Sequence, residues 1–168
     1  FHSSGSGGGV IQDAASSATL CAILAARHRI NRPEEITKLR AYVSNQAHSS
    51  AEKGLLVAGI NQQNIRLIEP DENLSMCLEN LEKAITEDVD AGYIPFFVMT
   101  TVGTTSSGAV DNVEEIAKLA TKVGAWVHVD AAWAGSATIC PEFRGILNGL
   151  DLADSYAFNP HKWMLTNF

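Results

Sequence analysis

Lys162 is the residue of this chain that most directly suggests covalent chemistry. It lies in the run Asn159-Pro160-His161-Lys162-Trp163, just after an apolar, strand-like segment at 154–158. A lysine whose pKa is lowered by burial or by neighbouring cations forms Schiff bases with carbonyl compounds. Taken alone, a surface lysine after a turn is the commoner case, because most lysines are solvated. The chemical interpretation therefore depends on which other groups reach the same place.

Two further polar clusters follow apolar segments. Val102-Gly103-Thr104-Thr105 comes after a long hydrophobic run, and Asp130-Ala131-Ala132 comes after a shorter one. In open parallel sheets, ligands bind beyond the carboxyl ends of the strands. Ordinary turn and capping residues would explain any one of these clusters, but they explain three clusters, one of them with a lysine, less well. The clusters are therefore treated as one candidate site.

Alternating strands and helices are expected to position this site. Helical spacing of apolar residues predicts helices at 14–29, from after His48 to Gly59, at 74–89 and at 113–123, the last capped by Asp111 or Asn112. Short apolar runs predict strands at 39–43, 65–68, 94–102, 125–129 and 153–158. This alternation indicates an α/β fold, with a mainly parallel sheet and helices on both faces.

Composition excludes several classes of protein. The chain has 168 residues, enough for about one domain, and its 46% hydrophobic and 18% charged residues are typical of a globular protein. A net charge of -7 argues against a nucleic-acid surface. No apolar run is long enough to cross a membrane. Three widely spaced cysteines and no signal peptide favour the cytoplasm.

Neither a metal site nor a nucleotide fingerprint is predicted. The five histidines lack metal-binding spacing, and His128, two residues before Asp130, is expected to be a core histidine or one that supports the site from behind. The glycine run at 5–9 fails the dinucleotide pattern, and the segment 103–110 lacks the lysine of a phosphate-binding loop. Ala14-Ala15-Ser16 remains a candidate phosphate cradle at a helix N-terminus.

Both ends of the chain look cut, which predicts an excerpt of a longer protein. The sequence opens inside a Gly/Ser run and stops within an apolar stretch. The leader His2-Ser3-Ser4-Gly5-Ser6 could instead be an expression scar.

Five motifs together resemble one enzyme family. In order and rough spacing, the chain is similar to the group II pyridoxal-phosphate-dependent decarboxylases, above all to the aromatic L-amino acid decarboxylase branch. The motifs that carry this resemblance are Gly7-Gly8-Gly9-Val10-Ile11-Gln12, Gln46-Ala47-His48-Ser49-Ser50, Gly103-Thr104-Thr105, His128-Val129-Asp130-Ala131-Ala132-Trp133-Ala134-Gly135 and Asn159-Pro160-His161-Lys162-Trp163.

The resemblance implies a fold and a domain. Residues 1–168 would form part of the cofactor-binding large domain of the aspartate-aminotransferase-like (fold type I) enzymes. The family's N-terminal segment, its catalytic loop with a tyrosine and its small C-terminal domain would lie outside the chain, so the isolated fragment is expected to be inactive. The family's active site is completed across a homodimer interface.

The resemblance also implies the cofactor, pyridoxal 5'-phosphate, and a role for each site residue. Lys162 would hold the cofactor aldehyde as an internal aldimine, Asp130 would keep the pyridine nitrogen protonated, and His48 would stack on the ring. These three residues are the expected catalytic groups. The remaining cofactor contacts, at the phosphate end and around the ring, would come from Ala15, Ser16, Thr105, Ala132, Asn159 and His161.

The implied reaction is decarboxylation of an aromatic L-amino acid, of the dopa, tryptophan or tyrosine type, to the amine and carbon dioxide through a quinonoid intermediate. The substrate itself is left open. Two alternatives also remain: an aromatic aldehyde synthase on the same scaffold, and a non-catalytic α/β nucleotide-binding module in which Lys162 is inert. Asp13-Ala14 departs from the family, where glycine and serine are usual.

Overall fold

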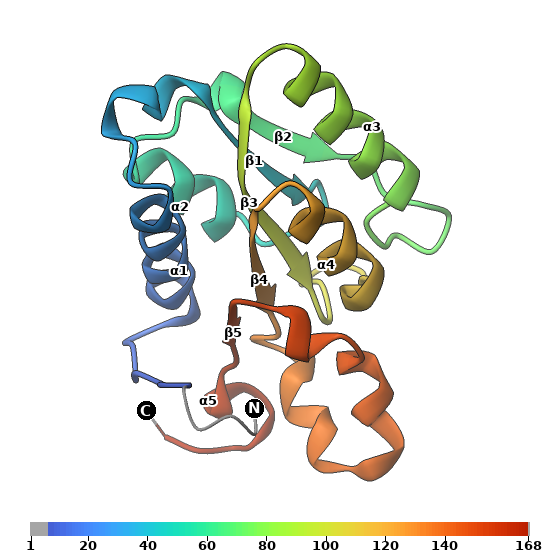
Figure 1. Ribbon diagram of the computed structural model, residues 1–168. Helices are drawn as coiled ribbons and strands as arrows, with labels where there is room; N and C mark the ends of the chain where they lie inside the picture. Colours follow the sequence, from blue (N-terminus) through green and yellow to red (C-terminus); the bar gives the residue numbers. More distant parts are fainter. Residues whose placement is uncertain (1–6, 168) are drawn as a thin grey trace.

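A five-stranded parallel sheet forms the centre of the molecule. The computed structural model describes residues 7–167, and Figure 1 shows the sheet with its strands in the order β2-β1-β3-β4-β5. The strands are β1 (Leu39–Ser44), β2 (Ile65–Ile68), β3 (Ile94–Thr101), β4 (Trp126–Asp130) and β5 (Ser155–Ala157). Every neighbouring pair is parallel, which confirms the predicted sheet.

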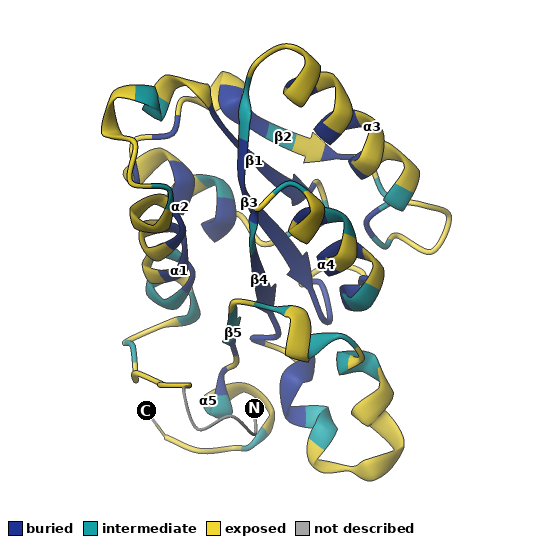
Figure 2. Ribbon diagram, viewed as in Figure 1, coloured by how far each residue is buried: buried dark blue, intermediate teal, exposed yellow. Residues whose placement is uncertain are grey.

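Helices cover both faces of this sheet, as predicted. One layer consists of α1 (Ala15–Ile30) and α2 (Ser50–Val57), and the other of α3 (Leu78–Asp90) and α4 (Val113–Lys122). A short helix, α5 (Pro160–Trp163), follows β5. Short 3-10 helices occupy Pro33–Lys38, Gln62–Asn64, Ala134–Ile139, Pro141–Leu147 and Leu150–Leu152. Figure 2 shows the buried side of each long helix turned toward the sheet.

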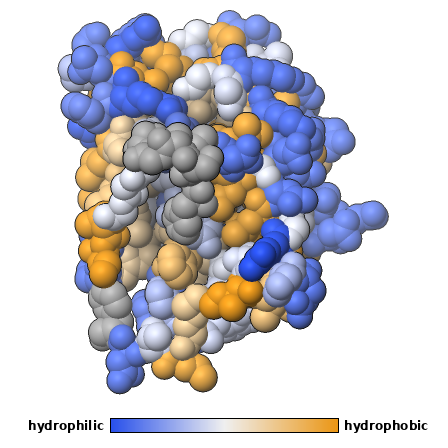
Figure 3. Space-filling view, turned by 60° about the horizontal axis from the view of Figure 1, so that its bottom comes forward, coloured by the Kyte–Doolittle hydropathy of each residue, from blue (hydrophilic) through white to orange (hydrophobic). Residues whose placement is uncertain are grey.

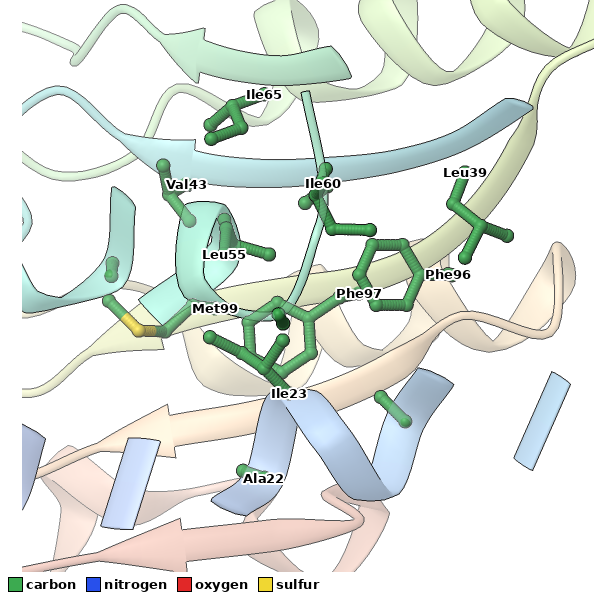
Figure 4. Close-up of a cluster of buried hydrophobic side chains, with 14 residues drawn as sticks. Ala22, Ile23, Leu39, Val43, Leu55, Ile60, Ile65, Phe96, Phe97 and Met99 are labelled. Atoms are coloured by element: carbon green, nitrogen blue, oxygen red, sulfur yellow. The ribbon is translucent and has the colours of Figure 1, made fainter. Parts of the chain in front are cut away.

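Two of the three hydrophobic core clusters follow from the alternation of side chains along the strands. Val43, Phe97 and Met99 point toward α1 and α2, where they pack with Ile23 and Leu55, as Figure 4 shows. Tyr42 and Val98, which are neighbours of these residues in sequence, point the other way and pack under α3 and α4. That second core includes Tyr42, Val98, Val127, Leu81 and Ile116. Strands buried on both faces explain the nearly continuous apolar runs in the sequence.

The third predicted helix begins later than its spacing suggested. Leu74 was expected on its apolar face, but Leu74 has a φ of 63° and is 43% exposed. The Asp71 side chain accepts hydrogen bonds from the backbone N–H groups of Asn73 and Ser75, and this turn occupies the place of the first helical turn. The helix itself starts at Leu78.

Other boundaries lie within a few residues of expectation. The fifth strand is shorter than predicted; just before it, the Asp154 N–H donates to the Val127 carbonyl oxygen and the Asp154 carboxylate accepts from the Val127 N–H. Asn112 caps α4 by accepting from the N–H of Glu115 at 3.2 Å. The alternative cap, Asp111, is turned instead toward β3. The glycine run at 5–9 begins in residues outside the described range.

Candidate active site

The predicted site residues converge on one cavity at the carboxyl edge of the sheet. The cavity has a volume of roughly 190 Å³ and lies where β3, β4 and β5 meet the first turns of α1 and α2. The predicted residues that line it are Ala15, Ser16, His48, Thr105, Asp130, Ala132, Asn159 and Lys162. Segments more than a hundred residues apart in the chain thus supply one site, as parallel topology allows.

His161 is the predicted site residue that does not line the cavity. It sits on α5 beside Lys162, and its side chain is exposed. Consecutive residues of a helix point about 100° apart, and on α5 it is the Lys162 side chain, not that of His161, that lines the cavity.

The N-terminus of α1 forms one wall. Ala14, Ala15 and Ser16 line the cavity there, and Ala14 is the N-cap residue. The first N–H groups of a helix have no intrahelical acceptors and carry a partial positive charge. The adjacent Ser17 hydroxyl is hydrogen-bonded to Asp13 and to the Ala14 carbonyl oxygen, so it is already engaged. This wall is suited to an anionic group.

Asp130 is the last residue of β4 and lies at the deep end of the cavity. It is 6% exposed, and its Oδ1 atom accepts a hydrogen bond of 3.0 Å from the Ala132 N–H. Thr101 is its register partner on β3, and the buried Thr101 hydroxyl has no hydrogen-bond partner within residues 7–167. A carboxylate and an unpartnered hydroxyl therefore lie side by side on the α1 face of the sheet.

His48 lies opposite, in the turn that leads into α2. Its Nδ1 atom accepts a 3.2 Å hydrogen bond from the Ser50 N–H and lies 2.8 Å from the Ser50 hydroxyl. An Nδ1 atom that accepts a backbone N–H carries no proton, so this hydrogen bond assigns the ring proton to Nε2. The ring is exposed, and a ligand in the cavity can cover its face.

The loops after β4 and β5 are tied together around Lys162. The Asn159 N–H donates to the Ala132 carbonyl oxygen at 3.3 Å, and the Lys162 N–H donates to the Asn159 carbonyl oxygen at 3.2 Å. The Trp133 and Trp163 rings meet edge to face, with their centroids 4.7 Å apart. These contacts hold the lysine segment against the Asp130 segment.

Sequence reasoning gave no individual role to four of the lining residues: Ser50, Thr101, Gly103 and Trp133. Thr101 ends an otherwise apolar strand and was taken as part of that strand. Its register with Asp130 could have been found only by pairing the two strands. Trp133 and Gly103 were quoted as parts of motifs without a role of their own.

Some kinds of site are not found in the described part of the chain. Residues 7–167 contain no group of three or more His, Cys, Asp or Glu side chains that could hold a metal ion. Within the same residues no helix is long and apolar enough to span a bilayer.

Comparison with known proteins gives a consistent result. The family model described as the pyridoxal-dependent decarboxylase conserved domain matches residues 1–168. Mouse aromatic-L-amino-acid decarboxylase is 50% identical over 175 residues, covering 98% of this chain and 36% of that protein. Arabidopsis thaliana phenylacetaldehyde synthase is 47% identical over 173 residues, covering 100% of this chain and 35% of that protein. The chain thus spans about a third of the length of these relatives.

Solved structures agree. The chain superposes with a TM-score of 0.94 on Oryza sativa TDC solved with PLP, at 43% identity, covering 96% of this chain and 36% of that one. For Catharanthus roseus tryptophan decarboxylase in complex with L-tryptophan, the TM-score is 0.96 at 45% identity, covering 100% of this chain and 37% of that one. Both likenesses extend over nearly the whole fold described above.

Proposed function

Because the chain belongs to the pyridoxal-dependent decarboxylase family, we propose that it is the cofactor-binding part of an enzyme that decarboxylates an aromatic L-amino acid to the amine and carbon dioxide. Residues 1–168 would correspond to part of the family's large domain. The rest of the protein would supply the remaining active-site groups and the small domain. The substrate class is inferred from the relatives, which include decarboxylases of aromatic amino acids.

One observation carries the proposal: Asp130, Lys162 and the N-terminus of α1 line the same cavity. Pyridoxal 5'-phosphate has a basic ring nitrogen, an aldehyde and a phosphate. The cavity offers a carboxylate, a primary amine and a helix N-terminus, which are the chemical complements of these three groups. The donor set therefore fits the cofactor.

Each residue then has a definite task. The Lys162 amine would bind the aldehyde carbon, and the negative charge of Asp130 would favour a proton on the ring nitrogen. The N–H groups of Ala15 and Ser16 would hold the phosphate, with Asn159 beside them. When bound, the cofactor supplies an electron sink that stabilises the negative charge left by the departing carboxylate.

Three further residues would orient the ring. His48 has an exposed face, a fixed Nδ1 bond and therefore one orientation in which to stack on the cofactor. Thr105 and Ala132 line the remaining sides of the cavity. For His161, which does not line it, we propose contact with the phosphate end only if α5 turns when the cofactor binds. Which substrate bond breaks depends on how these residues hold it relative to the ring.

The proposal is tested by trapping the cofactor on the lysine. The complete protein that carries this chain is incubated with pyridoxal 5'-phosphate, reduced with borohydride and digested, and the modified peptide is identified by mass spectrometry. We expect a phosphopyridoxyl group on Lys162 and its loss in Lys162→Ala, together with the loss of carbon dioxide release from dopa, tryptophan or tyrosine.

Lys53→Ala provides the matched control. Lys53 lines a second cavity that shares His48 and Ser50 with the first, so it is the lysine best placed to be labelled nonspecifically. Its replacement should leave the label on Lys162 unchanged. Labelling of Lys53 instead, or no label at all, would contradict the proposal and favour the non-catalytic α/β module.

Aldehyde synthesis on the same scaffold is the second candidate, favoured by the 47% identity to phenylacetaldehyde synthase. Such an enzyme consumes dioxygen and releases ammonia and hydrogen peroxide together with carbon dioxide. Assaying oxygen uptake and peroxide during turnover separates the two. A decarboxylase gives one amine per carbon dioxide and no peroxide.

We also propose a homodimer in the cytoplasm. Several apolar residues close to the cavity edge are exposed, among them Val10 at 75%, Ile11 at 84% and Leu165 at 90%. Figure 3 turns this edge toward the viewer and shows apolar side chains among polar ones. Exposed apolar surface of this kind supports a subunit interface. Separately, the free thiols of Cys21, Cys77 and Cys140 support a reducing compartment such as the cytoplasm. Sedimentation of the complete protein tests the dimer.

A further inference from the structure

A fully buried histidine lies directly behind the candidate site. His128 is two residues before Asp130 on β4, is 1% exposed, and stacks on the Phe97 ring with centroids 6.0 Å apart. Its Nδ1 atom lies 2.8 Å from the Ser155 hydroxyl of β5. Its Nε2 atom is buried and has no hydrogen-bond partner in the part of the chain that the structure describes. An imidazole in a core normally has both nitrogens satisfied.

The hydrogen bonds of Ser155 favour one tautomer of the His128 ring. The Trp126 indole donates to the Ser155 hydroxyl oxygen at 2.7 Å, and an indole N–H can only donate. The Ser155 hydroxyl keeps one proton to donate and a second lone pair, and we assign its proton to Nδ1 of His128, which lies 2.8 Å away. A neutral ring that accepts at Nδ1 carries its proton on Nε2.

The surroundings keep this ring neutral. Burial lowers the pKa of His128 to about 4, although the negative charge of Asp130 acts in the opposite direction. Strand β3 carries no charged side chain. Just before β5, Asp154 is engaged by Arg29 and the Val127 N–H, and Arg29 of α1 lies over the Trp126 ring. Among the charges of the packed elements, Asp130 is therefore the one that acts on His128.

The strand geometry places His128 on the same face of the sheet as the site. Residues two apart on a strand point to the same face, so His128 and Asp130 both lie on the α1 face of the sheet. The register pairs Met99 with His128 and Thr101 with Asp130. On this face of the sheet, the polar groups that lie between the imidazole and the cavity are the Thr101 hydroxyl and the Asp130 carboxylate.

We propose that His128 is a positioning residue for Asp130: the Trp126–Ser155 pair holds its neutral ring as the Nε2–H tautomer, and this N–H supports the ionised carboxylate from behind. A donor near an ionised carboxylate favours the charged form. The inference rests on the proposed function, because the consequence is that Asp130 keeps the proton on the cofactor ring nitrogen. His128 itself touches neither cofactor nor substrate.

The test measures the ring nitrogen directly, in the complete protein loaded with pyridoxal phosphate labelled with nitrogen-15 at that atom. His128→Asn places an amide near the Nδ1 position and removes the Nε2 donor, whereas His128→Gln places an amide near Nε2. We expect a protonated ring nitrogen in the parent and a titration midpoint about one pH unit lower, a tenfold change, in His128→Asn. His128→Gln should restore most of the midpoint, and Ser155→Ala should lower it less than His128→Asn does.

Two results would overturn the inference. One is an unchanged titration in His128→Asn when Asp130→Asn abolishes the protonated signal. The other, read without cofactor, is an Nδ1–H tautomer of His128 in the nitrogen-15 spectrum of the histidine-labelled protein. If the parent forms no adduct on Lys162, the proposed function fails, and the tautomer still decides the claim about His128. Circular dichroism verifies that each variant is folded.

Discussion

Gly103 shows how a single residue shapes the site. It has a φ of 84°, and a Cβ atom built on it would lie 2.6 Å from the Ala134 Cβ and 2.7 Å from the Trp133 ring. Both neighbours belong to the segment that follows Asp130. The absence of a side chain at Gly103 therefore lets the β3 and β4 loops approach each other and brings Trp133 to the cavity wall.

We expect Gly103→Ala to destabilise the protein by more than about 2 kcal/mol, because left-handed backbone strain and steric overlap add together. Gly92→Ala is the matched control: Gly92 has a φ of 81°, but a Cβ atom at this position would meet nothing within 4 Å. Its replacement should cost about 1 kcal/mol, from backbone strain alone. Urea denaturation measures both, and equal losses would mean that the close approach at Gly103 is unimportant. Cofactor affinity should fall only in Gly103→Ala.

The reactive groups of the site could be predicted from residue type, but the residues that contact and orient them could not. The lysine and the aspartate, which follow apolar segments, and the N-terminus of a helix could all be predicted from residue type and position in the sequence. Thr101 and Ser50 could not, because a hydroxyl in a strand or at a helix start has many ordinary roles. The state of His128 was also out of reach, since it depends on Ser155 and Trp126, which the sequence does not place beside it.

At the scale of elements, a buried ionic cluster joins β1, β2 and α3. Asp88 of α3 is 4% exposed and accepts from the Tyr42 hydroxyl at 3.0 Å. It pairs with Arg40 at 3.4 Å and with Arg66 at 3.1 Å. Burial and the charge of Asp88 raise the pKa of Tyr42, so the phenol keeps its proton and remains a donor. The cluster attaches α3 to the edge of the sheet.

Asp88→Ala should lower the free energy of unfolding by about 3–5 kcal/mol, because it leaves buried Arg40 without its counter-charge. Glu87→Ala removes the other partner of Arg66, but Glu87 is 53% exposed, so the loss should stay below about 1 kcal/mol. Chemical denaturation of both variants provides the comparison. Similar losses would show that burial does not distinguish the two carboxylates.

Elements were predicted well where hydrophobic pattern alone decides them. The strand at 65–68 was expected with the bounds it has, and the helix at 113–123 differs from α4 by one residue. The pattern failed at Leu74, where Asp71 forms a side-chain turn that competes with the helix. Element boundaries depend on such local hydrogen bonds, which hydrophobic spacing does not encode.

At the scale of the whole molecule, two buried titratable groups affect folding in opposite directions. Burial raises the pKa of Asp111 to about 6, although its carboxylate accepts from the N–H groups of Met76 and Thr101. Burial lowers the pKa of His128 to about 4. At a pH between 3.8, the ordinary pKa of an aspartate, and the folded value of about 6, folded Asp111 holds a proton that the unfolded chain has lost. For His128 the unfolded chain holds the extra proton.

The signs follow from this difference in bound protons. The stabilising contribution of His128 is complete above its unfolded pKa of about 6.5 and is lost as the pH falls toward 4, whereas that of Asp111 is complete near pH 4 and is lost as the pH rises through 6. Each contribution is on the order of 3 kcal/mol. In the parent protein these two groups together should therefore change the free energy of unfolding little with pH, because the gain from one offsets the loss from the other.

Single variants should reveal the hidden slopes. Relative to the parent, His128→Asn should become less stable as the pH rises from about 4 to about 7, because the parent gains the His128 contribution over that range and the variant does not. Asp111→Asn should become more stable relative to the parent over the same range, because only the parent loses the Asp111 contribution. Urea denaturation of the cofactor-free complete protein across this range measures both differences. Parallel pH curves for parent and variants would mean that neither group titrates differently in the folded state, and slopes of the same sign would mean that one of the two shifts has the wrong direction.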